Sequence, residues 1–132
     1  MRFRLKKEHI GVLAYVILEI FPNYDPDGTR VLQHVWDKVL QCKAKLEDSG
    51  QKTITLEIQD ADVISIEDII CDACRGRCSQ ILHNVIARNG QIPPDERSIM
   101  VETYHKCIRA RKIVTRMGNS LRMRAYGQRA AA

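Results

Sequence analysis

The sequence contains no apolar run long enough to cross a membrane. Its most apolar stretch, residues 10–21, is twelve residues long and includes Glu19, whereas a bilayer span needs about 20 apolar residues. No small-residue cleavage site follows this stretch, so we do not expect a secretory signal peptide. These absences predict a cytoplasmic protein that makes no membrane contact.

Enzyme signatures are also missing. The chain has no GxGxxG dinucleotide motif, no P-loop, no nucleophile elbow and no HExxH metalloprotease motif. Its four histidines, His9, His34, His83 and His105, are scattered along the sequence. Isolated histidines more often have structural or surface roles than catalytic ones. We therefore expect a binding protein and not an enzyme.

Acidic residues are absent from the last 30 positions, and this absence divides the chain by charge. Residues 1–102 have 13 basic and 16 acidic side chains, which gives a net charge of −3. Residues 103–132 have a net charge of +8, from Lys106, Arg109, Arg111, Lys112, Arg116, Arg122, Arg124 and Arg129. The overall charge of +5 therefore combines a mildly acidic body with a strongly basic C-terminal end.

The basic end carries the clearest functional signal. Arg109, Lys112 and Arg116 follow helical spacing and share one face of a predicted helix. The forked donors of arginine match phosphate oxygens, and Tyr126 can stack on an exposed base. The predicted binding residues are Lys106, Arg109, Arg111, Lys112, Arg116, Arg122, Arg124, Tyr126 and Arg129.

Two kinds of partner fit such a basic helix. The leading hypothesis is a small nucleic-acid-binding or nucleoprotein-associated protein that holds phosphates. The alternative is a protein–protein adaptor or inhibitor, such as one encoded by a mobile element, that docks the helix on an acidic protein surface. No base-reading motif is present, so the sequence locates no specificity.

An acidic segment contrasts with the basic end. Residues 57–73 contain no basic side chain and six carboxylates, namely Glu57, Asp60, Asp62, Glu67, Asp68 and Asp72. We expect a solvated face, or an anchor for a basic surface of this chain or of a neighbour. Self-association is therefore one alternative, and a homodimer would also bury the apolar stretch at residues 10–21 and the edges of a small sheet.

Five cysteines without a secretory signal favour reduced thiols over disulfides. Cys71, Cys74 and Cys78 fit the apolar stripe of a core helix, and we expect no cofactor. The alternative, a third functional hypothesis, is a structural zinc ion on Cys71 and Cys74, with Cys107 and His105 as further ligands. Cys71 and Cys78 cannot both bind that ion, because a continuous helix separates them by about 10 Å along its axis.

The hydrophobic patterns predict an α+β fold dominated by helices, with about four helices and a small two- or three-stranded sheet. Strands are expected at residues 2–7 and 53–58, because apolar and polar residues alternate there. Helices are expected at residues 8–21, 29–49, about 65–88 and 96–117. Residues 63–66 fit either a short strand or the approach to the third helix.

Helix ends are predicted from proline, glycine and capping residues. Pro22, Gly50, Asn89-Gly90 and Gly118 are expected to end the four helices, and Thr29 to cap the second. Residues 1–118 then form a single compact domain. Residues 119–132 form a basic tail that is flexible unless it is bound.

Overall fold

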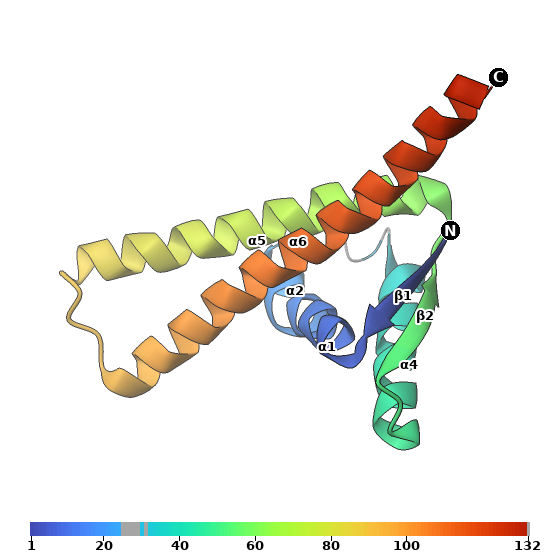
Figure 1. Ribbon diagram of the computed structural model, residues 1–132. Coiled ribbons are helices and arrows are strands. Elements are labelled where there is room, and N and C mark those ends of the chain that lie inside the picture. Colours follow the sequence, from blue (N-terminus) through green and yellow to red (C-terminus); the bar gives the residue numbers. More distant parts are fainter. Residues whose placement is uncertain (25–29, 31, 132) are drawn as a thin grey trace.

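The computed structural model describes residues 1–24, 30 and 32–131 (Figure 1). The described residues form four helices and a two-stranded antiparallel sheet, and the structure is 81% helical. The predicted helix-dominated α+β fold is therefore confirmed.

The two predicted strands pair with each other. Strand β1 (Arg2–Lys6) runs antiparallel to β2 (Thr53–Glu57), with Phe3 opposite Leu56. Phe3, Leu5 and Leu56 are buried, so the period-two alternation identified the inward face correctly.

The first helix continues through the residue that was expected to end it. Three segments follow one another along the chain: α1 (Lys7–Tyr15), the π-helical η1 (Val16–Ile20) and α2 (Phe21–Tyr24). The prediction that Pro22 ends the helix is therefore wrong. Pro22 has no N–H and its ring does not fit against a regular α-helical turn. The wider π turn directly precedes it, and the Phe21 N–H bonds to the Val16 carbonyl five residues back.

Helix α4 (Gln33–Ser49) ends where the sequence predicted. Gly50 adopts a left-handed conformation (φ 70°) and donates its N–H to the Leu46 carbonyl at 3.2 Å. Trp36 on this helix packs edge-on against Phe21, with 5.3 Å between ring centroids. The predicted cap, Thr29, lies outside the described residues.

The last two helices form a long hairpin. Helix α5 (Asp60–Ala87) and helix α6 (Pro94–Ala131) are joined by a turn in which Asn89 and Gly90 have positive φ. Helix α5 begins at Asp60, so the expected start near Ser65 is wrong and residues 63–66 are helical. Figure 1 shows α6 crossing α5 and continuing past it toward the C-terminus.

Helix α6 does not end at Gly118, contrary to the prediction. A glycine inside a helix costs about 1 kcal/mol relative to alanine, which is why the sequence suggested an end there. Here Gly118 lies at a close approach between helices: a Cβ atom added to it would be 1.6 Å from Oε2 of Glu67 on α5. Packing therefore explains the glycine, and the helix continues to Ala131.

The core lies between the sheet, the first helix and the hairpin. Ile10, Val16 and Phe21 have no exposed surface, and Trp36, Leu56 and Val114 are each 1% exposed. The apolar stretch at residues 10–21 is thus largely buried within one chain, although Leu18 remains 52% exposed.

Replacing Leu56 by alanine tests the role of β2 in this core. Leu56→Ala leaves a cavity against Phe3 and should lower the free energy of unfolding by about 3 kcal/mol. Thr55→Ala, on the exposed face of the same strand, should change it by about 0.5 kcal/mol or less. Urea unfolding followed by circular dichroism measures both, and equal effects would contradict the assigned register.

Candidate functional site

An open groove of about 740 Å³ lies between α5 and α6. Helix α6 contributes more of its lining than α5 does. The lining residues are Glu67, Asp68, Cys71 and Arg75 from α5, and Ile108, Arg111, Lys112, Thr115, Arg116 and Asn119 from α6. On each helix these positions recur every three or four residues, which places them on one face. We call this feature the basic groove, because four of its side chains are cations and only two are carboxylates.

The four cations of the basic groove keep their charges available to a ligand. No carboxylate in the described part of the chain lies within 4.0 Å of the side-chain nitrogens of Arg75, Arg111, Lys112 or Arg116. Arg75, Lys112 and Arg116 are also exposed to solvent. Unpaired guanidinium and ammonium groups on one surface favour anions, since arginine offers forked donors and lysine a mobile point charge.

Two other predicted binding residues hold α6 against the rest of the protein. Lys106 pairs with Glu102 at 2.9 Å and lies 4.1 Å from the ring centroid of Tyr15 on α1. Arg109 approaches Glu8 of α1, with 3.6 Å between Nη2 and Oε2. Although Arg109 was predicted to share a face with Lys112 and Arg116, it does not line the basic groove.

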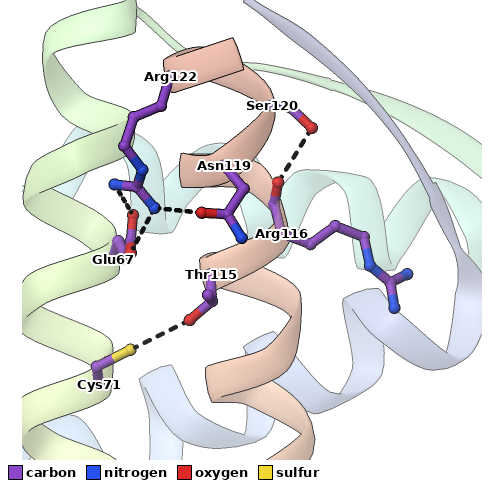
Figure 2. A network of polar contacts seen from close by, with 7 residues as sticks. All are labelled: Glu67, Cys71, Thr115, Arg116, Asn119, Ser120 and Arg122. Atoms are coloured by element: carbon purple, nitrogen blue, oxygen red, sulfur yellow. Dashed lines mark hydrogen bonds and ion pairs between the residues drawn. The ribbon is translucent and has the colours of Figure 1, made fainter.

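Arg122 forms a further link inside the chain (Figure 2). Its two terminal nitrogens each donate to a Glu67 oxygen at 3.0 Å, and Nη2 also donates to Asn119 at 2.7 Å. The hydrogen bond to Glu67, with the charges of Glu67 and Asp68, raises the pKa of Arg122. The acidic segment and the basic end, which the sequence suggested as mutual partners, therefore meet within one molecule at this point.

Arg116 extends the basic surface across α6. Figure 2 shows its side chain pointing away from Glu67 and Arg122. It also lines a smaller pocket of about 190 Å³ together with Arg4 and His9. Arg116 thus connects the basic groove with cationic and titratable side chains on the other side of the helix.

Sequence reasoning missed Arg75, Arg4 and His9 because it considered only the basic end. The alternation of apolar and polar residues in β1 does indicate where Arg4 lies, because burial of Phe3 and Leu5 leaves the Arg4 side chain on the outward face. No sequence signal places Arg75 beside α6, because that depends on how two helices cross. Nothing in the sequence pattern places His9, three residues after the end of β1, near Arg116.

The remaining predicted residues lie on the part of α6 beyond Gly118. Arg124 is exposed and Tyr126 is 72% exposed, next to Met123 at 69%. The side chain of Arg129 lies outside the described residues. This segment presents basic, aromatic and apolar side chains together to solvent.

The cysteines divide between the core and the basic groove. Cys74 and Cys107 have no exposed surface and Cys78 is 9% exposed, so Cys74 and Cys78 lie in the core as predicted. Cys71 faces the groove instead, with its Sγ 3.8 Å from the Thr115 hydroxyl (Figure 2). The two residues considered for zinc, Cys71 and Cys74, therefore have different surroundings. Among the residues described, no three histidine, cysteine or carboxylate side chains are placed to hold one metal ion.

Two of the three core thiols, Cys74 and Cys78, are weak acids, whereas the hydrogen bond with Cys74 lowers the pKa of Cys107. A hydrogen bond with the Cys107 thiol, followed by burial, raises the pKa of Cys74. Burial, followed by the proximity of Cys107, raises the pKa of Cys78 to about 11. Both thiols therefore remain protonated at neutral pH, which is the form that packs as a small apolar group.

Comparisons with protein-family models, with curated proteins and with solved structures gave no match for this chain. In the described residues, no helix combines the length and apolar character needed to span a membrane. A function therefore has to be inferred from the residues of this chain.

Alkylation rates test the state of the cysteines. Because the pKa of Cys78 is about 11 instead of 9.0, its thiolate is about 100-fold rarer at neutral pH. Iodoacetamide labelling read by mass spectrometry should therefore be at least about 100-fold slower for Cys78 in the folded protein than in urea. Cys71 should react before Cys74 and Cys78, and EDTA should change none of the rates. Faster labelling of Cys71 and Cys74 after EDTA would instead support the zinc hypothesis.

A double-mutant cycle tests the contact between Gly118 and Glu67. Glycine to alanine in an unobstructed helix interior stabilises by about 1 kcal/mol. We expect Gly118→Ala to stabilise by less than this, or to destabilise, because the new Cβ displaces Glu67 from Arg122. In a Glu67→Ala background the full gain of about 1 kcal/mol should return. Urea unfolding of the four proteins measures the cycle, and additive effects would show that Glu67 does not lie over Gly118.

Proposed function

We propose that this protein is a non-enzymatic nucleic-acid-binding or nucleoprotein-associated protein that holds phosphates in the basic groove. The observation that carries the proposal is the groove itself: four cations from two helices line it, and no described carboxylate lies within 4.0 Å of their charged nitrogens. Of the two carboxylates that also line the groove, Glu67 is already paired with Arg122. Three other basic residues of the C-terminal end are already paired with Glu102, Glu8 and Glu67. Within residues 103–127, the cations without a carboxylate within 4.0 Å are therefore Arg111, Lys112 and Arg116 in the groove and Arg124 beyond it.

The arrangement of the cations favours a polymer over a small anion. Arg111 and Arg116 are five residues apart on α6, about 7.5 Å along the helix axis. Arg75 lies on the other wall of the groove, and Arg4 shares the pocket on the opposite side of Arg116. Charges spread along a surface in this way fit successive phosphates of a backbone better than a single compact anion.

The exposed end of α6 adds a second kind of contact to this proposal. Arg124 can pair with a further phosphate, and Tyr126 has the exposed aromatic face that stacks on an unpaired base. Base stacking of this kind is tolerant of sequence, so the proposed binding has no strong sequence preference. The stacking contact favours single-stranded nucleic acid or a duplex end, whereas the phosphate contact is open to both.

An acidic protein surface remains the second candidate partner. The observation in its favour is an apolar pocket at the far end of the hairpin, lined by residues including Leu82 and Val101. Nucleic-acid backbones offer no apolar group to such a pocket, whereas protein helices do.

Removing two charges from the basic groove tests the proposed function. Fluorescence anisotropy with labelled DNA and RNA, measured from about 50 to 200 mM salt, gives a log–log slope of about −0.9 per duplex phosphate or −0.7 per single-strand phosphate. Lys112→Gln with Arg116→Gln should weaken binding to all sequences and make the slope shallower by between about 1.4 and 1.8. The matched control, Lys43→Gln with Lys52→Gln, removes the same charge from residues that do not line the groove and should leave the slope nearly unchanged.

Two results would overturn this function. One is the absence of any binding to DNA or RNA at low salt. The other is equal weakening by the groove pair and by the control pair, which would mean that overall charge, and not the basic groove, attracts the nucleic acid.

A further inference from the structure

An apolar pocket of about 260 Å³ lies between the end of α5 and the start of α6. Its walls come from both helices and are almost wholly apolar, with Ile81, Leu82, Val85, Met100, Val101 and Tyr104 among the lining residues. Leu82 is 50% exposed and Val101 is 49% exposed. Folding of the chain therefore leaves this apolar surface in contact with water, which is typical of an interaction site.

The apolar pocket lies on the same face of the hairpin as the basic groove. On α6, the lining residues 97, 101, 104, 108, 111 and 115 pass from one feature to the other at intervals of three or four residues. Residues with this spacing share one face of a helix. The pocket and the groove therefore follow one another along one face of the hairpin, and we call the two together the trough, which is apolar toward the α5–α6 turn and basic toward the other end.

The charged groups that line the apolar pocket are basic, and the carboxylates nearest to its wall along α6, Glu96 and Glu102, are paired with Arg88 and Lys106. Arg97 and His105 line the pocket itself, and Arg75 and Arg111 line the adjoining part of the basic groove. No carboxylate in the described part of the chain lines the pocket. An occupant that matches these surroundings has apolar side chains at its centre and carboxylates on both sides.

We propose that the apolar pocket docks an acidic amphipathic helix of a partner protein. The α6 wall runs from residue 97 to residue 105, about 12 Å along the axis or two helical turns. Two turns present apolar side chains at positions i, i+3 or i+4, and i+7, the usual anchors of a helix in a groove. Carboxylates beyond the anchors then face Arg97 at one end and Arg75 with Arg111 at the other.

A second copy of this chain fits the pocket less well. In a dimer with two-fold symmetry and antiparallel hairpins, the apolar pocket of one chain faces the apolar pocket of the other. The basic groups at the two ends, Arg97 at one and Arg75 with Arg111 at the other, would then approach basic groups of the partner. Like charges at both ends oppose that arrangement, whereas an acidic helix meets opposite charges. This inference goes beyond phosphate binding and does not depend on it.

Synthetic helical peptides test the proposed chemistry with the full-length protein. The probe is a fluorescein-labelled peptide of about 18 residues with leucine anchors at i, i+3 and i+7 and flanking glutamates. One control peptide has lysines in place of the glutamates, and another has alanines in place of the leucines. We expect the glutamate–leucine peptide to bind at least about tenfold more tightly than either control.

Variants locate the binding site and separate this inference from the proposed function. Leu82→Gln with Val101→Gln should weaken binding of the glutamate–leucine peptide by about tenfold or more. The matched control, Leu18→Gln, changes an equally exposed leucine on η1 and should leave peptide binding unaltered. The Leu82 and Val101 substitutions keep the net charge, so nucleic-acid affinity and its salt slope should not change.

Three outcomes would overturn the acidic-helix proposal. The first is no preference for the glutamate–leucine peptide over its controls, and the second is equal weakening by Leu18→Gln. The third is a dimer in sedimentation analysis that Leu82→Gln with Val101→Gln converts to a monomer, because the occupant would then be a second copy. Circular dichroism melting of each variant shows whether a loss of binding reflects unfolding.

Discussion

The close packing of α5 against α6 is the contact on which the rest of the molecule depends. The side chains that meet between the helices are small or short: Cys74 and Cys78 face Cys107, Cys71 reaches Thr115, and Glu67 lies over Gly118. Small side chains let two helical backbones approach closely, and protein interiors are packed with few voids. The basic groove and the apolar pocket both lie between these two helices, so both depend on this crossing.

The crossing also decides which charges stay available. Glu67 approaches α6 from α5 and pairs with Arg122, while Glu8 of α1 pairs with Arg109. Three of these four side chains are exposed and Glu67 is half-buried, and ion pairs near the surface contribute little to stability. Their larger effect is on the distribution of charge, because they neutralise part of the basic end and leave Arg111, Lys112, Arg116 and Arg124 unpaired among its described side chains.

The trough along the hairpin has a basic part and an apolar part, and the two parts suit different classes of partner. Its basic part suits phosphates, and its apolar part suits the side chains of a helix. Arg75 and Arg111 lie where the two parts meet. A protein that holds a nucleic acid in one part and an acidic helix in the other would link the two partners, and the shared arginines would make their binding interdependent.

Much of the fold was predictable because local patterns reflect local physics. Alternation in the two strands, the helical stripes and the turns at Gly50 and Asn89-Gly90 all follow from neighbours within a few residues. The same local reasoning predicted helix ends at Pro22 and Gly118, and both predictions were wrong. A π turn accommodates the proline, and the glycine makes room for Glu67, so packing outweighed intrinsic propensity at both positions.

The sequence by itself determined that positive charge is concentrated after Glu102, since composition does not depend on folding. Only the tertiary structure decided which of those charges are neutralised, and that Arg75 joins Arg111 and Lys112 on one groove. The reason is distance: an ion pair requires atoms within a few ångströms, and Glu67 and Arg122 are 55 residues apart in the sequence. Folding alone brings such groups together.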